Sequence, residues 1–594
     1  MTGSSLTGSL LGRHGWVLAI LVSLPALAPV LSPGWYEGHD DQHIFRLFEY
    51  DLALRDGQIP PRWFPDISAG YGSPHPSYYA PLFYLIAETF HLGGLSAIAS
   101  LKAAIALLVL LSSVSMFFLA RAFYGSPAAL VAAAAYTYAP YHLLDLYVRK
   151  AFSEFSVFAF LPALLLCYYN LFVRGSRWDV IAAALSTAAM CMAHTISTMM
   201  VPPLLIAYAL LLTLRSTGTG RWLWLRKAAV AAIIGASISG FFTIPAVLER
   251  NDVNIQIYTS AYVDYAKHFV YPIQMIWWPW GYGLSLEGLR DQISFRIGLL
   301  QIAGSLLAVS ALGRPARIGK AGSDHAIFFL VLTGVALFMM MPVSNVVWTA
   351  LPALHFVQFP WRFLMIASFG TAALCGVGFL ALGHAPDPRS PSAARRGWVL
   401  ACVLAAAFPV ASALGGMLSV HLSIPTERIG FTETPYIKLV DRGEAAAGDP
   451  WKLDSSFVRA HTLSWFDHVP AGAPIRVSAD ELRRPRIEVA GGSGSFSDLR
   501  ASSREMRFRV DAATTTRIRV NTYRHPGWTV LVDGSPVPLV EIPGTLPVIL
   551  FDVGEGSHQV LVQLGRTSPR AIGDLTTLVG LAAIALIGLW PVRE

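Results

Sequence analysis

The sequence predicts a polytopic α-helical membrane protein with a β-rich domain near its C-terminal end. Of the 594 residues, 54% are hydrophobic and only 14% are charged, whereas an ordinary soluble domain has about 25% charged residues. The apolar residues gather into runs of about 20, the length that a helix needs to cross a bilayer. The composition therefore excludes a soluble globular protein.

About twelve candidate spans follow one another along the chain. They lie at about 16–31, 97–120, 127–144, 155–173, 178–194, 197–214, 228–248, 294–312, 325–341, 360–382, 397–417 and 571–590. The first run could also be a signal peptide, because small residues that suit cleavage surround Ala28. All four cysteines (Cys167, Cys191, Cys375 and Cys402) fall inside apolar runs, so neither a disulfide framework nor a cysteine-bound zinc ion is expected.

Short basic loops predict the orientation in the membrane. The chain has 44 Lys and Arg against 37 Asp and Glu, a net charge of +7, and most of the basic residues lie between apolar runs. Such an excess indicates the orientation of the protein in the membrane rather than nucleic-acid binding, because positively charged loops stay in the cytoplasm. We therefore expect both termini in the cytoplasm and three polar segments outside, at 35–95, 249–293 and 420–569.

The apolar stretch 81–94 decides this topology. At about 14 residues it suits an interfacial or re-entrant helix better than a crossing. If it crossed the bilayer, every later basic loop would change sides, against the positive-inside rule. We expect it to lie along or partly within the outer surface.

Alternating apolar and polar residues beyond residue 505 predict antiparallel strands. The alternation is clearest in Arg507-Phe-Arg-Val510, Thr516-Arg-Ile-Arg-Val520, Trp528-Thr-Val-Leu-Val532 and His558-Gln-Val-Leu-Val-Gln563, with turns at Asp533-Gly534 and Gly554-Glu-Gly556. We expect a multi-span domain at 1–419, an extracytoplasmic β-sandwich within 420–569, and a final span with a cytoplasmic tail at 570–594. The glycine-rich stretch 491–495 lacks the Lys-Ser/Thr of a phosphate loop and predicts a turn.

The densest group of ionisable residues near the membrane follows the first span, in Glu37-Gly-His-Asp-Asp-Gln-His43 and Arg46. On a helix, Asp40, His43 and Arg46 recur at every third position and share one face. A carboxylate there could act as a general base on an acceptor hydroxyl, while Arg or His stabilises an anionic leaving group. The alternative is a solvated loop in which an Asp caps a helix.

Longer motifs add a family resemblance to this local pattern. They are Gly38-His-Asp-Asp-Gln-His43, Gly57-Gln-Ile-Pro-Pro-Arg-Trp63, Ala69-Gly-Tyr-Gly72, Tyr79-Ala-Pro-Leu-Phe-Tyr84, Arg149-Lys-Ala-Phe-Ser-Glu154, Ala193-His194, Pro279-Trp-Gly-Tyr-Gly283, Gln358-Phe-Pro-Trp-Arg362 and His525-Pro-Gly-Trp528. With these motifs the chain resembles a bacterial family of polytopic membrane proteins labelled as related to 6-pyruvoyl-tetrahydropterin synthase. It is also similar to the wider GT-C superfamily of membrane glycosyltransferases.

The resemblance implies an enzyme of the bacterial plasma (inner) membrane that uses a polyprenyl-phosphate sugar and carries an essential acid on its first external loop. Asp40 matches that acid best, and Asp41 is the neighbouring candidate. His39, His43 and Arg46 become candidates for substrate binding.

Three points limit what the resemblance implies about the chemistry. The pterin label transfers no activity, because the zinc-binding histidine set of that soluble enzyme is not found here. Lys150 stands after Arg149 where a small residue is expected, and no Asp-x-Asp metal motif occurs. The participation of a divalent cation is therefore left open.

A lipid-linked donor carries its phosphate at the level of the headgroups, so its ligands should lie where external segments meet the membrane. The candidates at that level are Glu154 as a further catalytic residue, and Arg149, Lys150, His194, Asp264, His268 and Arg362 as substrate-binding residues. Each also has a structural interpretation, since charged side chains anchor helices at the interface and snorkel toward water.

The resemblance, together with these patterns, implies a membrane glycosyltransferase that moves a sugar from a polyprenyl-phosphate donor to an extracytoplasmic glycan or protein. Asp40 is expected to deprotonate the acceptor, while Arg149 and Arg362 offset the charge of the leaving phosphate. One alternative is a transporter or flippase of lipid-linked glycans, which should show internal repeats or spans broken by charged residues. The other is a non-catalytic scaffold whose β-domain binds glycan or protein.

Overall fold

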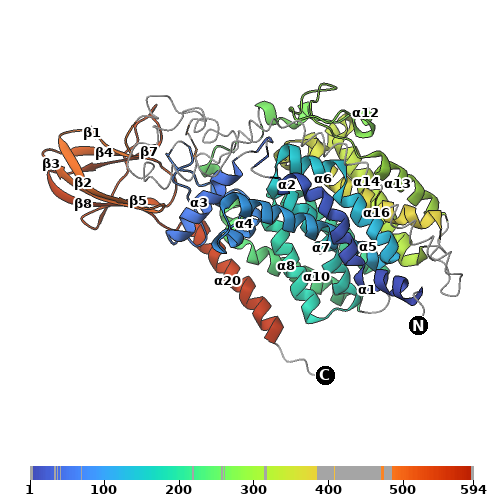
Figure 1. The fold of residues 1–594 in the computed structure, drawn as a ribbon. Helices are drawn as coiled ribbons and strands as arrows, with labels where there is room; N and C mark the ends of the chain where they lie inside the picture. The colour runs from blue at the N-terminus through green and yellow to red at the C-terminus, as the bar shows by residue number, and fades with distance from the viewer. Residues whose placement is uncertain are drawn as a thin grey trace.

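A computed structural model shows a helical bundle with a β-sheet domain attached at one end (Figure 1). It describes residues 4–383 and 484–589, with gaps at 33–34, 37, 41, 69, 217–219, 256–258, 260 and 314–317, together with residues 407, 470–471 and 473. The predicted span at 397–417 lies outside the described residues, apart from residue 407. The bundle is drawn from blue to yellow in Figure 1, and the β-domain is orange.

The helices of the bundle follow the apolar runs of the sequence. They are α1 (Ser4–Ser23), α2 (Ala28–Leu31), α3 (His43–Arg55), α4 (Leu82–Leu92), α5 (Ala97–Thr137), α6 (Pro140–Leu144), α7 (Phe152–Val173), α8 (Arg177–Ala193), α9 (Ser197–Arg215), α10 (Arg221–Ile238), α11 (Gly240–Leu248), α12 (Pro272–Ile276), α13 (Leu299–Leu312), α14 (Gly319–Met340), α15 (Asn345–Ala350), α16 (Leu364–Leu382) and α20 (Ser568–Leu589).

The described residues contain seven helices that are long and apolar enough to cross a membrane. The count becomes eight if α10 and α11, which meet at a bend of 74°, form one span. The count differs from the expected twelve partly because α5 is one helical stretch broken at Gly125, whose φ is 79°, and covers most of two predicted spans. In addition, α8 and α13 have only 17 and 14 residues.

Helices α16 and α20 mark the centre and the edge of the bundle. α16 packs against α5, α13 and α14, and 94% of its apolar segment is buried. The close approach of α13 and α16 depends on Gly304 and Gly378, because a Cβ on Gly378 would collide with the Gly304 carbonyl oxygen. α20 is only 11% buried; it packs on one side against α10 and α11 and lies at the edge of the bundle in Figure 1.

Helix α4 matches the short apolar stretch that decides the predicted topology. Its 11 residues span only about 16 Å at 1.5 Å per residue, which is about half of the hydrocarbon thickness. One face buries Phe83, Tyr84 and Ala87 against neighbouring helices. This length agrees with a helix that does not cross the bilayer, and its orientation at the outer surface stays a prediction.

The β-domain consists of two antiparallel sheets. Its strands are β1 (Ile487–Gly491), β2 (Gly494–Ala501), β3 (Glu505–Ala512), β4 (Thr516–Tyr523), β5 (Trp528–Val532), β6 (Ser535–Val537), β7 (Val548–Val553) and β8 (Gly556–Leu564). The strand orders are β1-β4-β7 and β2-β3-β8-β5-β6, and residues of both sheets share one buried apolar cluster. The four predicted strands are confirmed. Asp533 and Gly534 form the predicted turn, with φ values of 51° and 80° that suit a tight hairpin.

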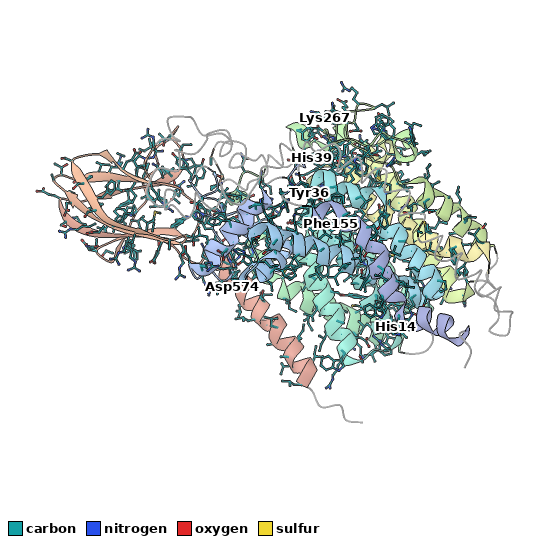
Figure 2. The ribbon with its side chains drawn as sticks, viewed as in Figure 1. His14, Tyr36, His39, Phe155, Lys267 and Asp574 are labelled. Atoms are coloured by element: carbon teal, nitrogen blue, oxygen red, sulfur yellow. The ribbon has the colours of Figure 1, made fainter. Side chains whose placement is uncertain are left out.

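The first loop joins the β-domain to the bundle through hydrogen bonds. Gln58 Nε2 donates to Ser503 Oγ at 2.8 Å, and the backbone N–H of Tyr523 donates to the Tyr71 carbonyl at 2.7 Å. Figure 2 shows Asp574 at the point where α20 leaves the bundle; its carboxylate pairs with Arg62 of the first loop at 2.7 Å. The first loop therefore holds both the β-domain and the last helix.

Candidate active site

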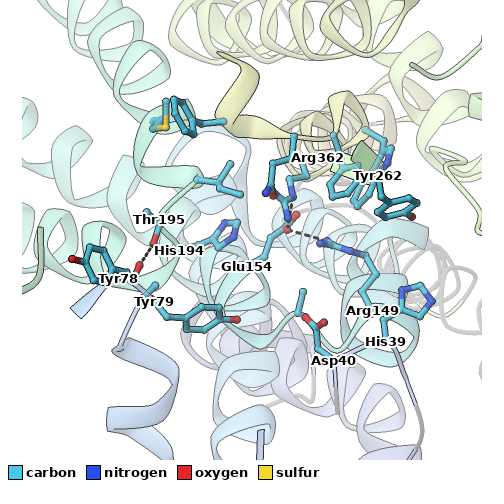
Figure 3. Close-up of a pocket in the computed structure, with 18 of the residues that line it drawn as sticks. His39, Asp40, Tyr78, Tyr79, Arg149, Glu154, His194, Thr195, Tyr262 and Arg362 are labelled. Carbon is cyan, nitrogen blue, oxygen red and sulfur yellow. Dashed lines mark hydrogen bonds and ion pairs between the residues drawn. The ribbon is translucent and has the colours of Figure 1, made fainter. Parts of the chain in front are cut away.

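A cavity of ≈ 460 Å³ opens where the first loop meets the helical bundle. Its polar wall includes His39, Asp40, Arg149, Glu154 and Arg362. Figure 3 shows Glu154 between Arg149 and Arg362, with Asp40 nearby. Its apolar wall is formed by side chains of α9, α11 and nearby loops: Ile196, Met199, Ala246, Val253, Ile255, Ile293 and Phe356. The cavity thus has a charged side and an apolar side.

Glu154 lies at the centre of the charged side, between two arginines. Its Oε2 is 2.9 Å from Arg149 Nη1 and 3.3 Å from Arg362 Nε. Its Oε1 accepts a hydrogen bond from the hydroxyl of Tyr141 at 2.6 Å. The Glu154 side chain is 2% exposed, so these partners are what permits a charge in this position.

Arg149 is placed by an irregular turn that precedes α7. Residues Asp145–Arg149 form a single π-helical turn, a feature that often occurs at functional sites. The guanidinium Nη1 lies 2.5 Å from Asp145 Oδ1 and donates to the Tyr141 hydroxyl at 2.9 Å. Its flat face stacks on Trp361, with 4.6 Å from Cζ to the ring centre. Arg149 therefore has anchors of its own, independent of Glu154.

Arg362 is placed by the loop that leads into α16. Its Nη1 donates to the Val357 carbonyl at 3.0 Å and to Gln358 Oε1 at 2.7 Å, so the side chain folds back over its own loop. The backbone of Gln358 has φ of 69°, which turns the chain sharply there. The remaining Nε points at Glu154.

Asp40 lies in the extended segment before α3, not on the helix that the spacing predicted. The backbone N–H groups of His39 and Asp40 donate to the carbonyls of Val148 and Arg149 at 2.9 and 3.1 Å. Among the residues that the structure describes, the Asp40 carboxylate has no hydrogen bond or ion pair. Burial raises the pKa of this carboxyl above its ordinary value, against the opposing influence of Arg46 and Arg149.

Three further predicted residues also line the cavity. His39 is exposed, and its Nε2 lies 3.0 Å from the Tyr282 carbonyl oxygen. Arg46 donates to Gln42 at 2.6 Å and stacks over Tyr79, with 4.5 Å to the ring centre. The His194 ring is fixed by Ser197, 2.9 Å from its Nδ1.

His43 and Lys150 are not part of the cavity wall, because each is held in the protein interior. His43 lies between the Tyr84 hydroxyl and the Lys150 carbonyl, at 2.9 and 2.6 Å. Lys150 donates to the Tyr36 carbonyl at 2.8 Å and faces the ring of Trp35 at 4.9 Å. Both residues tie the first loop to the turn that carries Arg149.

Asp264 and His268 do not line the cavity, although both partners of His268, Ser285 and Tyr262, do. Asp264 caps a short turn by accepting from the Ala266 N–H at 3.1 Å. His268 is buried, 2.8 Å from Ser285 Oγ and 2.5 Å from the Tyr262 carbonyl. Asp41 lies outside the described residues.

Several residues of the site have no counterpart among the predicted site residues, among them Arg250 of the cavity wall, Tyr141, Asp145 and Trp361. Tyr141 and Asp145 hold Arg149, and the four-residue steps from 141 to 145 to 149 were a readable helical signal. In the sequence, Trp361 stood out only as a member of the motif that contains Arg362. Its ring N–H donates to Ser285 at 3.2 Å, a partner that no sequence spacing identifies.

No cluster of three or more His, Cys, Asp or Glu side chains that could hold a metal ion occurs within the described ranges. The cysteines in those ranges, Cys167, Cys191 and Cys375, are free thiols.

Comparison with solved structures finds several matches with low sequence identity. The arabinofuranosyltransferase AftD of mycobacteria is 15% identical with a TM-score of 0.43, over 70% of this chain and 27% of that one. The oligosaccharyltransferase of Archaeoglobus fulgidus, in its apo form, is 14% identical with a TM-score of 0.42, over 80% and 61%. ArnT from Cupriavidus metallidurans, bound to undecaprenyl phosphate, is 15% identical with a TM-score of 0.38, over 76% and 69%.

This chain therefore spans about a quarter of the mycobacterial protein. No curated protein matches the sequence. Residues 77–408 match a family of membrane proteins, and this range includes Arg149, Glu154 and Arg362 of the cavity. The match covers more than half of the 594 residues, so the chain belongs to the membrane-protein family described as the 6-pyruvoyl-tetrahydropterin synthase related domain.

Proposed function

We propose that this protein is a membrane glycosyltransferase that moves a sugar from a polyprenyl-phosphate donor to an extracytoplasmic glycan or protein. The observation that carries the proposal is one cavity in which an unpaired carboxylate, Asp40, shares the wall with Arg149 and Arg362. Group transfer from a phosphate needs both a base for the acceptor and cations for the leaving group.

In the proposed reaction, Asp40 takes the proton of an acceptor hydroxyl. The acceptor oxygen forms a bond to the anomeric carbon of the sugar as the bond from that carbon to the phosphate oxygen breaks. The electron pair of the broken bond leaves with the polyprenyl phosphate, whose charge Arg149 and Arg362 offset. The displacement inverts the configuration at the anomeric carbon.

The raised pKa of Asp40 supports the role of base. A general base works best when its pKa lies near the working pH, and burial moves this carboxyl in that direction from its ordinary value of 3.8. The absence of a described hydrogen-bond or ion-pair partner leaves its oxygens available to a hydroxyl.

The apolar wall supports a donor with a hydrocarbon tail. Met199 and Phe356 border the cavity and are 41% and 38% exposed, an unfavourable arrangement in water that a lipid chain would relieve. Under the predicted topology, with the first loop and the β-domain outside the cytoplasm, the cavity lies at the outer surface of the membrane, where such a lipid presents its phosphate.

Replacement of Asp40 by Asn tests the proposal. The side chain keeps its size and loses its basicity, so we expect sugar transfer to fall by about 10²-fold to 10⁴-fold with unchanged expression and melting temperature. Transfer is measured in nanodiscs with a polyprenyl-phosphate sugar and envelope glycan as acceptor. Asp41→Asn should have a smaller effect.

Asp264→Asn is the matched control, because Asp264 caps a turn away from the cavity. Near-normal transfer by the Asp40 variant would contradict the assignment of the base. Movement of lipid-linked glycan across the vesicle bilayer, without formation of a glycosidic bond, would identify the protein as a flippase. A wild-type protein that shows neither transfer nor transport but binds glycan would identify a scaffold.

A further inference from the structure

Two arginines share one oxygen of Glu154. Arg149 and Arg362 are each 9% exposed at the side chain, and both approach Glu154 Oε2, at 2.9 and 3.3 Å. Two buried positive charges this close repel each other unless an anion lies between them. In the free protein, Glu154 supplies that anion.

Neither arginine depends on Glu154 for its position. Arg149 is also anchored by Asp145 and by Tyr141, and Arg362 by Val357 and Gln358. The Oε2 atom could therefore leave while both guanidinium groups kept their places. Glu154 Oε1 has a separate partner in the Tyr141 hydroxyl.

The point where the two arginines converge also lies on the cavity wall, because all three residues line it. Arginines that converge on one point are suited to a phosphate oxygen, which accepts several charge-assisted hydrogen bonds. Among the residues that the structure describes, the cavity wall holds four arginines (Arg46, Arg149, Arg250 and Arg362) and two carboxylates, Asp40 and Glu154. The wall thus carries an excess of positive charge that an anionic ligand would balance.

We infer that Glu154 is a placeholder for the donor's phosphate: its Oε2 occupies the position that a phosphate oxygen takes, and the arriving phosphate displaces it. This inference rests on the proposed function and assigns Glu154 a positioning role in place of the expected catalytic one. When the product phosphate leaves, the carboxylate returns to the arginines and so favours release.

The inference predicts a variant that binds better and turns over more slowly. Glu154→Gln removes the competing charge, so we expect undecaprenyl phosphate to bind at least about tenfold more tightly, since a charge-assisted hydrogen bond contributes about this much. kcat should fall because product release slows, and KM should fall with it. Glu154→Asp keeps the competing charge and should bind undecaprenyl phosphate within about threefold of the wild type.

Glu249→Gln is the matched control, because Glu249 is another buried glutamate paired with an arginine, Arg570, at 3.1 Å. It does not line the cavity, so its loss should leave the affinity for undecaprenyl phosphate unchanged. Affinity is measured on the full chain in nanodiscs by titration of tryptophan fluorescence, with dodecyl phosphate and inorganic phosphate as further probes to separate the tail from the headgroup.

The outcomes separate the inference from the proposed function. Tighter binding by Glu154→Gln alone supports the inference. Binding by the wild type that Glu154→Gln does not tighten overturns the inference and leaves the proposed function standing. No binding by any of these proteins overturns both.

A second measurement does not depend on the variant's folding. In a structure of the wild-type protein with undecaprenyl phosphate, Glu154 Oε2 should lie more than 4 Å from both arginines, beyond ion-pair distance. Contacts of 2.9 and 3.3 Å retained beside a bound phosphate would overturn the inference.

Discussion

Two buried groups of glutamate and arginine in this protein differ in how many arginines face the glutamate. At the junction of α11 and α20, Glu249 pairs with Arg570 at 3.1 Å, and its other oxygen accepts from the Thr567 hydroxyl. In the cavity, one oxygen of Glu154 faces two arginines at once. At the junction one arginine faces the glutamate, whereas in the cavity two arginines share one glutamate oxygen.

The surroundings of the two groups explain the difference. Arg570 also contacts His525 of the β-domain at 3.1 Å, and Tyr78 donates to the Glu249 carbonyl at 2.8 Å. Every contact at the junction is thus made by the chain itself and joins three parts of the fold. The cavity group instead borders open volume and an unpaired Asp40. A buried ion pair that is enclosed by other parts of the chain stabilises the fold. A buried ion pair that borders open volume indicates a ligand site.

The largest effect is expected at the junction. Glu249→Gln leaves Arg570 charged and buried, and breaking a buried pair in this way costs about 3–5 kcal/mol of stability. The melting temperature in detergent should fall strongly, while transfer per folded molecule stays unchanged. A marked loss of transfer at a temperature where the variant is fully folded would mean that the junction also serves the site.

The next effect is expected at the cavity. Arg149→Lys keeps the charge but loses the planar fork and the stacking on Trp361, so transfer should fall by about 10²-fold to 10³-fold with a small change in melting. Arg570→Lys is the counterpart at the junction and should lower melting rather than transfer. The same response from both variants would erase the distinction between the two groups.

The pH dependence of transfer should belong to the cavity alone. Asp40 acts as a carboxylate, and its pKa is raised by burial, so the rate should fall about tenfold per pH unit below that pKa. The acid limb therefore lies above pH 3.8, the ordinary value for this group. A pH–rate profile should show this limb in the wild type and in Glu249→Gln, and lose it in Asp40→Asn. A limb that persists in Asp40→Asn would assign it to another group.

The smallest effect is expected away from both groups. Asp264→Ala removes a turn cap, which costs about 1 kcal/mol at most sites of this kind, and transfer should stay within about twofold of the wild type. Measurement of KM for the donor provides the check. A large increase in KM would restore Asp264 to the substrate-binding residues that the sequence predicted.

The sequence identified several residues of the cavity because their chemistry is unusual for their surroundings. Asp40, Arg149, Glu154, His194 and Arg362 are polar or charged at the ends of apolar runs, and all of them line the cavity. It did not distinguish them from His43 and Lys150, which have the same chemistry in neighbouring positions. Those two are satisfied by Tyr84 and Tyr36, and only packing decides which polar side chain faces open volume.

The sequence by itself determined the membrane class, because runs of apolar residues of bilayer length cannot be buried in a soluble fold. It also determined the β-domain, since alternation with period two specifies a strand with one buried face. The tertiary structure alone decided that Arg362 lies close to Glu154 and Arg149. It also decided that the Trp361 ring covers one face of the Arg149 guanidinium group. Local sequence patterns identify residues that are neighbours within a few helical turns. The two arginines that share Glu154 come from segments that are distant along the chain and become adjacent only when the bundle packs.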